Sequence, residues 1–294
     1  MAENSTLLEP EFLRKLEQLS LVNKRAFAGQ LKGERKSTRR GTSVEFADFR
    51  NYTLGDDLRY VDWNTFARLE RLFLKLFVEE EDLHVYMLVD GSQSMNFGSP
   101  TKFDYSRRIA AALGYIGLAN QDRVGGAIFA ERLGNYLPPV RGRGQVMSYF
   151  RFLDQTQPGG KTSFAASLKE YALRTRRPGV AVLISDFMDP DWAAGMMALL
   201  QRRFQVTAIQ VLDRAELDPR LLGDLRLVDS ETGEQREITV SAALLKDYQR
   251  TVQEFCGGVQ DTCRKYGVDY LLAPTDQPFE DLILKWLRRA GLLR

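Results

Sequence analysis

The stretch "HVYMLVDGSQSMNFG", residues 84–98, decides the fold predicted for this chain. An apolar run of strand length ends abruptly at Asp90 and is followed by Ser92 and Ser94 in a short polar loop. A continuous apolar run indicates a strand buried on both faces, as in a parallel sheet. Ligands of open α/β sheets bind beyond the carboxyl ends of the strands. We therefore expect Asp90 to lie at a ligand-binding edge.

Predicted strands and helices alternate from residue 83 onward. The strands are predicted at 84–89, 122–130, 179–187, 204–213 and 268–275, with 132–140 as an antiparallel neighbour, and the helices at 102–120, 144–155, 163–176, 191–203 and 278–293. Such alternation predicts an α/β fold with a doubly wound, mostly parallel sheet covered by helices on both faces. A β-hairpin predicted at 224–240 interrupts the alternation before a long helix at 241–266.

The chain is expected to divide into three parts. Residues 1–37 are predicted as an N-terminal helix and a basic linker, whose stretch 32–40 we interpret as a solvated loop. Residues 38–82 are predicted to pack on the core, with a strand at 71–80 and with Trp63 and Phe66 as anchors. In this segment we expect a salt-bridged turn built from Asp56, Asp57, Arg59, Asp62 and Arg68. Residues 83–294 form the α/β domain with its inserted hairpin.

Composition excludes several functional classes. The chain has 41 Lys and Arg against 39 Asp and Glu, which does not indicate a general nucleic-acid binder. With His84 as the single histidine, Ser/His/Asp chemistry and a two-histidine zinc site are not expected. Cys256 and Cys263 would lie about 10 Å apart along a helix, too far for a disulfide. No leader or apolar segment of membrane-spanning length is evident, so we expect a cytoplasmic protein without a transmembrane segment.

Three loops place oxygen atoms at the predicted sheet edge. Ser92 and Ser94 follow Asp90 at alternating positions, the strand at 179–187 ends near Ser185 and Asp186, and Thr162 stands in a glycine-rich loop before a helix. Carboxylate and hydroxyl oxygens suit Mg²⁺ or another hard divalent cation such as Mn²⁺ or Ca²⁺. The alternative is that Asp90 and Ser92 cap the following helix and that Thr162 is an N-cap.

These residues resemble two known family patterns. "DGSQSM" is similar to the D-x-S-x-S metal-ion-dependent adhesion site of von Willebrand factor A domains, with Thr162 and Asp186 resembling the motif's separated threonine and aspartate. The upstream stretch "EFADFRNYTLGDDLRYVDWNTFARLERLFLKLFVEEE" resembles the signature of the bacterial domain-of-unknown-function family fifty-eight. The resemblance covers about residues 38–275. One departure is that adhesion domains usually read T-D-G where this chain reads Ser185, Asp186 and Phe187.

The resemblance implies a von Willebrand factor A-like, Rossmann-like fold and a metal site made of Asp90, Ser92, Ser94, Thr162 and Asp186. It also implies a partner, because such family members are typically encoded beside MoxR-type AAA+ ATPases and are thought to assist the assembly or activation of protein complexes. The resulting hypothesis is a non-enzymatic, chaperone-like module for metal-dependent protein-protein interaction. A partner carboxylate would complete the coordination shell of the ion.

Three rival functions are weaker. A phosphohydrolase of the haloacid dehalogenase type needs a second carboxylate two residues after its first aspartate, where this chain has Ser92. The "GGKT" at 159–162 lacks the first glycine of a nucleotide-binding P-loop, because Gln155 stands at that position. A nucleic-acid binder would rest on the separated basic clusters at 32–40 and 174–179, which match no motif.

Overall fold

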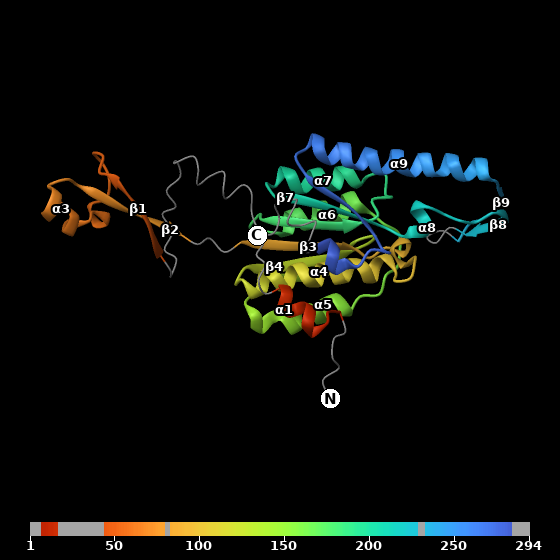
Figure 1. Cartoon of the computed structure of the whole chain (residues 1–294), viewed down its shortest axis with the longest axis horizontal. Helices are drawn as coiled ribbons and strands as arrows, with labels where there is room; N and C mark the ends of the chain where they lie inside the picture. Colours follow the sequence, from red (N-terminus) through yellow and green to blue (C-terminus); the bar gives the residue numbers. More distant parts are fainter. Residues whose placement is uncertain (1–6, 17–43, 80–82, 229–232, 284–294) are drawn as a thin grey trace, which may run out of the picture. The chain divides into compact units, whose positions relative to one another are not determined.

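The structure is a computed structural model that describes residues 7–16, 44–79, 83–228 and 233–283 (Figure 1). The described residues within Met1–Gln30 and Leu83–Arg294 form one compact unit, and those within Leu31–Asp82 form a second. The predicted basic loop 32–40, the continuation of the N-terminal helix after residue 16 and the closing helix after residue 283 lie outside the described residues.

A six-stranded, mostly parallel sheet forms the centre of the larger unit. Its order is β10 (Asp269–Pro274), β7 (Gln205–Leu212), β6 (Val180–Ser185), β3 (His84–Asp90), β4 (Arg123–Phe129) and β5 (Leu133–Arg141). All neighbouring pairs are parallel except β4 with β5, which is antiparallel. The predicted mixed α/β architecture with a mostly parallel sheet is confirmed, including the antiparallel neighbour at one edge.

Strand order reverses at β3. From β3 the chain continues outward through β4 and β5, and it then returns to place β6 on the other side of β3. The helices that follow β3 (Lys102–Ala119) and β6 (Trp192–Gln201) pack on opposite faces of the sheet. The carboxyl ends of these two strands are therefore the topological switch point at which open α/β sheets bind ligands, and we call this place the crevice. Asp90 is the last residue of β3 and Ser185 the last of β6, so both lie at this crevice.

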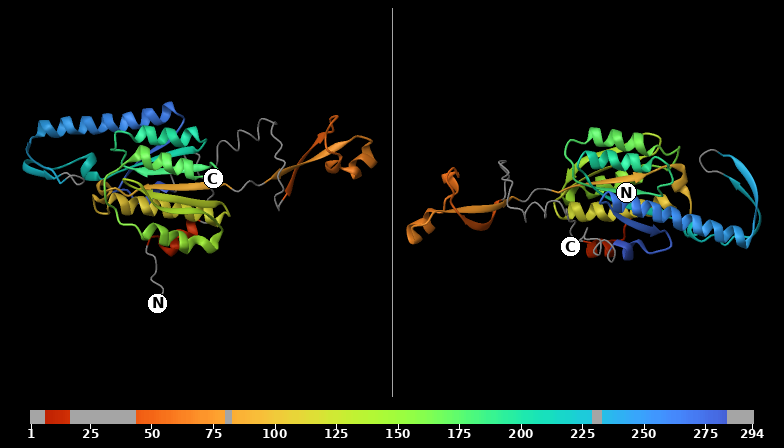
Figure 2. Two further views of the ribbon diagram at one scale, coloured as in Figure 1. Left: turned by 180° about the vertical axis from the view of Figure 1, so that it is seen from behind. Right: turned by 90° about the horizontal axis from the view of Figure 1, so that it is seen from above.

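Helices cover both faces of the sheet (Figures 1 and 2). One face packs on α1 (Pro10–Leu16), α4 (Lys102–Ala119), α5 (Val146–Asp154) and α10 (Phe279–Asp281), and the other on α6 (Phe164–Arg174), α7 (Trp192–Gln201) and the C-terminal part of α9 (Ala242–Lys265). Along β3, Val85, Met87 and Val89 enter the first core while Tyr86 and Leu88 enter the second. This two-sided burial explains the continuous apolar run of β3.

The predicted hairpin forms as β8 (Gly223–Val228) and β9 (Gln235–Val240), paired from Gly223 opposite Val240 to Val228 opposite Gln235. It follows the short helix α8 (Arg214–Leu217) and leads into α9. The first half of α9 runs past the edge of the sheet toward the hairpin (Figures 1 and 2), and within α9 only Val259 and Cys263 are buried. The hairpin and the start of α9 therefore contribute little to the core.

The smaller unit is built on the antiparallel pair β1 (Val44–Asn51) and β2 (Phe73–Glu79), with a 3₁₀ turn η1 (Leu58–Tyr60) and a helix α3 (Trp63–Leu69) between them. Asp62 caps α3 by accepting from the N–H groups of Asn64 and Thr65. The strand predicted at 71–80 is present as β2, whereas β1 and α3 were not predicted.

Ion pairs hold the turn of the smaller unit. Arg50 bonds Asp56 at 2.7 Å and Arg59 bonds Asp57 at 2.5 Å. The expected salt-bridged turn therefore forms in part: Arg50 is an additional member, and Asp62 caps α3 instead. The rings of Trp63 and Phe66, which were predicted as anchors, meet edge to face with centroids 6.1 Å apart, and their side chains are 56% and 38% exposed. Packing of this segment on the larger unit stays a prediction.

Candidate functional site

Asp90 is the central carboxylate of the crevice. Its side chain is fully buried, its Oδ2 accepts from the Ser185 hydroxyl at 2.6 Å, and its Oδ1 accepts from the Ser92 N–H at 3.0 Å. Burial and the nearby charge of Asp186 raise the pKa of Asp90 to about 7, against the opposing effect of these hydrogen bonds. Asp90 therefore binds a proton more readily than an ordinary aspartate does.

The two serines connect Asp90's loop to Asp186. The hydroxyl oxygens of Ser92 and Ser94 lie 3.0 Å apart, and the Ser94 hydroxyl donates to Asp186 Oδ2 at 3.0 Å. Ser92 stands at the N-cap position of the 3₁₀ turn η2 (Gln93–Asn96), as the capping alternative expects, but its side chain makes no capping hydrogen bond. The structure thus gathers Asp90, Ser92, Ser94 and Asp186 at one point, as their spacing predicts.

Thr162 lies on a loop that is fastened to the same site. The N–H of Gly159 donates to Gly91 O at 2.8 Å, and the N–H of Gln93 donates to Gly160 O at 2.9 Å. Among the residues that the structure describes, the Thr162 hydroxyl makes no hydrogen bond to the cluster. Ser163, and not Thr162, is the residue at the N-cap position of α6, so the capping alternative is wrong for Thr162.

Phe187 explains the departure from the T-D-G pattern. Its φ of 60° lies in the left-handed region, the conformation that glycine adopts without strain. The ring is buried and packs on Trp192 at 5.3 Å and on Phe164 at 5.6 Å between centroids. Phe187 thus adopts a backbone conformation that favours glycine, and the packing of its ring holds it there.

Lys102 is a member of the site that sequence reasoning missed. It begins α4, its side chain is 1% exposed, and its ammonium donates to Asp186 Oδ2 at 2.9 Å and to Glu216 Oε1 at 2.7 Å. Burial lowers the pKa of Lys102, but attraction to the two carboxylates outweighs burial and raises it overall. A lysine in the first turn of a helix opposes the helix dipole, and this local conflict was the available signal.

Glu216 was also missed, although its local pattern is recognisable. Asp213 and Glu216 form a capping box at α8, in which the Asp213 N–H donates to Glu216 Oε2 at 2.8 Å. The other carboxylate oxygen, Oε1, is the one that accepts from Lys102. Burial raises the pKa of Glu216, while the ammonium opposes that shift. One carboxylate therefore joins the start of α8 to the crevice.

The oxygen atoms of the crevice fit a small hard cation. Adjacent ligands of octahedral Mg²⁺ lie about 3.0 Å from each other, because each is about 2.1 Å from the ion. The Ser92–Ser94 and Ser94–Asp186 oxygen pairs are both 3.0 Å apart. Among the described residues, no group of three or more His, Cys, Asp or Glu side chains is arranged to hold a metal. An ion here would depend on the serine hydroxyls together with Asp90 and Asp186.

Two exposed apolar side chains border the crevice. Phe97 and Met188 are each 48% exposed. Met188 is tied to the site because its N–H donates to Asp186 Oδ1 at 3.1 Å, and Phe97 because its carbonyl accepts from the Lys102 N–H at 2.9 Å. These two apolar side chains are therefore exposed close to the cluster, where a protein partner could cover them.

Other residues singled out in the sequence lie away from the crevice. His84 begins β3, at the opposite end of the strand from Asp90, and its ring is 6.2 Å from that of Tyr86. Cys256 and Cys263 are free thiols, which confirms that they form no disulfide. Over the described ranges, no helix is both long and apolar enough to span a membrane.

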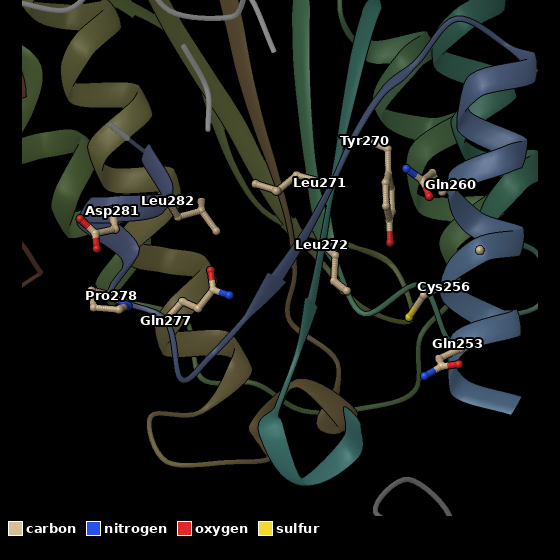
Figure 3. A pocket seen from close by; sticks show the side chains of 11 residues that line it. Gln253, Cys256, Gln260, Tyr270, Leu271, Leu272, Gln277, Pro278, Asp281 and Leu282 are labelled. Atoms are coloured by element: carbon tan, nitrogen blue, oxygen red, sulfur yellow. The ribbon is translucent and has the colours of Figure 1, made fainter. Parts of the chain in front are cut away.

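A groove of about 740 Å³ lies between α9, the edge strand β10 and the start of α10 (Figure 3). Gln253, Cys256 and Gln260 line it from α9, and Tyr270 and Leu272 from β10. Two strands, β7 and β6, separate β10 from β3. The groove contains none of the candidate metal-binding residues, so the chemistry of the crevice is independent of it.

Comparison with known proteins identifies bacterial relatives without an assigned function. An uncharacterized protein of Mycobacterium tuberculosis is 29% identical over 293 residues, covering 97% of this chain and 92% of the relative. An uncharacterized protein of Mycobacterium avium is 33% identical over 138 residues, covering 46% of this chain and 81% of the relative.

Two solved structures show a weaker likeness. The conserved hypothetical protein BatB from Bacteroides thetaiotaomicron matches with a TM-score of 0.45 and 14% identity, over 71% of this chain and 98% of that one. An aerotolerance-related membrane protein from Bacteroides fragilis matches with a TM-score of 0.46 and 17% identity, over 70% and 99%. These scores are too low to carry an argument.

The family comparison covers most of the chain. Residues 48–255 match one family, a range that includes the strands of the smaller unit in part and every candidate residue of the crevice. The chain therefore belongs to the family described as protein of unknown function DUF58.

Proposed function

We propose that this chain is a non-enzymatic module that binds a protein partner through a divalent cation, on a von Willebrand factor A-like domain. The observation that carries the proposal is the cluster of carboxylate and hydroxyl oxygens at the crevice where strand order reverses, bordered by exposed Phe97 and Met188. We propose Mg²⁺ as the ion, a MoxR-type AAA+ ATPase or its client complex as the partner, and the cytoplasm as the location.

Each residue has a distinct part in this proposal. Ser92 and Ser94 would hold the ion with their hydroxyls, and Asp186 and Asp90 would hold it directly or through water, with Thr162 completing the set from its own loop. Bound to few carboxylates, the ion would supply a positive charge that attracts an Asp or Glu of the partner. Phe97 and Met188 would bury apolar surface around that contact.

The geometry argues against the enzymatic alternatives. Ser92 is fully buried and stands where a phosphohydrolase would need its second carboxylate, and a hydroxyl is a poor general acid. In the loop at 159–162, the Gly159 N–H already donates to Gly91 O, so this amide is not free to bind a phosphate oxygen. Both observations favour binding over catalysis.

The direct test is cation binding by the full chain. We expect calorimetry to show one Mn²⁺ or Mg²⁺ bound by the wild type, and we expect Ser94→Ala to weaken this binding at least tenfold. Ser148→Ala, a half-buried serine on α5 away from the crevice, is the matched control and should bind like the wild type. Equal binding by Ser94→Ala and the wild type would contradict the proposed site.

The partner is tested with a purified MoxR-type ATPase from the same organism. Co-sedimentation should occur in Mg²⁺ and be lost in EDTA or with Ser94→Ala. Phe97→Ser should weaken the complex without changing cation affinity, because Phe97 has an exposed apolar side chain that offers no ligand and the substitution adds no charge. A complex that persists in EDTA would show that docking does not depend on the ion.

A further inference from the structure

The cluster already contains a cation of its own. The Lys102 ammonium, on a side chain that is 1% exposed, bonds Asp186 at 2.9 Å and Glu216 at 2.7 Å. Two carboxylates therefore share one ammonium, and Asp90 lies within the electrostatic reach of Asp186. A buried ammonium is costly unless carboxylates pair with it, so the pairing holds Lys102 at this position.

One oxygen atom has two roles. Asp186 Oδ2 accepts from Lys102 at 2.9 Å and from the Ser94 hydroxyl at 3.0 Å. A divalent ion held between Ser94 and Asp186 would bind the oxygen that the ammonium also uses. Two cations on one oxygen atom in a buried site repel each other strongly. The ion and the ammonium therefore compete for Asp186.

Glu216 offers the ammonium another position. Its Oε1 is closer to Lys102 than Asp186 is, and its Oε2 is fixed by the Asp213 N–H at 2.8 Å. The same helix α8 is joined to α9, because the Tyr248 hydroxyl donates to Glu216 O at 2.9 Å. Glu216 is thus a fixed acceptor that can keep the ammonium when Asp186 is engaged elsewhere.

We propose that Lys102 is an internal cation that competes with the divalent ion for Asp186, and that Glu216 holds the ammonium when the ion is bound. The Lys102–Glu216 pair then sets the cation affinity of the crevice. This inference rests on the proposed function, since it concerns the same ion site. It states that Lys102 and Glu216, which lie outside the adhesion motif, control how tightly that site binds its ion.

Competition predicts opposite effects for the two partners. Lys102→Met removes the competitor, so Mn²⁺ should bind about tenfold more tightly than to the wild type. Glu216→Gln leaves the ammonium with Asp186 alone, so Mn²⁺ should bind about tenfold more weakly. A simple change of net charge would act in the same directions, and a double variant separates the two explanations.

The double variant Lys102→Met/Glu216→Gln has the same net charge as the wild type. If charge alone acts, its Mn²⁺ affinity should return to that of the wild type. If Lys102 competes for Asp186, the double variant should bind as tightly as Lys102→Met, because Glu216 acts only through the ammonium. This non-additivity is the signature of the proposed coupling.

The experiment is a Mn²⁺ titration of the full chain by electron paramagnetic resonance, with thermal unfolding in EDTA and in saturating Mn²⁺ as a second readout. Lys102→Met should unfold at a lower temperature than the wild type in EDTA and recover in Mn²⁺. Lys169→Met, an exposed lysine on α6, is the matched control. If Lys102→Met can be purified only with Mn²⁺, Glu216→Asp tests the proposal, because it keeps the charge but holds it farther from the ammonium and should still weaken Mn²⁺ binding.

The outcomes separate this inference from the proposed function. Unchanged affinity in Lys102→Met and Glu216→Gln, with wild-type binding that Ser94→Ala removes, would overturn the inference and leave the ion site standing. Binding by Lys102→Met but not by the wild type would support the inference and contradict a wild-type ion site. No binding by either protein would overturn both.

Discussion

Two regions of this protein hold carboxylates in ion pairs of similar length and very different setting. In the crevice, Lys102 and Asp186 meet at 2.9 Å with side chains 1% and 2% exposed. In the smaller unit, Arg59 and Asp57 meet at 2.5 Å with side chains 80% and 41% exposed. Water screens the second pair, whereas the first pair is buried away from solvent. The contribution of an ion pair to the stability of the protein therefore depends on its burial and not only on the distance between its atoms.

The largest expected effect comes from breaking the buried pair. Without a divalent ion, Lys102→Met should lower the free energy of unfolding by about 3–5 kcal/mol, because it leaves the buried Asp186 and the partly buried Glu216 without their cation. Urea denaturation in EDTA measures this loss. The control Lys169→Met should have nearly the wild-type free energy of unfolding. If Lys102→Met loses no more stability than this control, solvent must screen the ion pairs of Lys102.

The protonation of Asp90 should give the next largest effect. The folded pKa of Asp90, about 7, lies above the value of about 3.9 for an unfolded aspartate. Proton binding to Asp90 therefore stabilises the folded state, and this contribution to the free energy of unfolding is fully present below pH 4. That contribution should decline as the pH rises from 4 to 7, by up to about 4 kcal/mol, and stay constant above. Asp90→Asn should lack the decline.

Urea denaturation of wild type and Asp90→Asn in EDTA, between pH 4 and pH 8, checks this expectation. The two proteins should be closest in stability near pH 4, and the variant should be the more stable at pH 8. A constant difference across the range would show that Asp90 does not titrate there. The same variant should no longer bind Mn²⁺ at any of these pH values.

A smaller effect is expected from the hydroxyl that supports Asp90. Ser185→Ala removes the 2.6 Å hydrogen bond to Asp90 Oδ2, which should cost about 1–3 kcal/mol at pH 8. Because this bond lowers the pKa of Asp90, its loss should raise that pKa further. Carboxyl ¹³C chemical shifts followed against pH would report the change, and a downward shift would contradict the role given to Ser185.

The smallest effect is expected at the exposed pair. Arg59→Ala should leave the thermal unfolding of the protein unchanged within error, at low and at high salt, since both side chains keep their water when the pair breaks. A loss comparable to that of Lys102→Met would mean that the Arg59–Asp57 pair is buried in solution. That result would support the predicted packing of residues 38–82 on the core.

Local pattern explains which elements were predicted. The apolar run of β3 and the regular spacing of α4 and α9 are long enough to show their period, so their positions follow from the sequence. The strand β1 was missed because its register shifts between Phe46 and Asp48, which interrupts the two-residue alternation. The helix α3 has 7 residues, too few to display a helical period.

Some residues of the candidate site likewise follow from the local sequence, and others do not. The sequence by itself determined that Asp90, Ser92 and Ser94 follow a buried strand and that Asp186 follows another, because strand ends and turns are set by neighbouring residues. Only the tertiary structure decided that Lys102 and Glu216 join them. These two residues are 114 positions apart, and their contact depends on strand order and on the packing of α4 and α8 at the crevice, which no local pattern encodes.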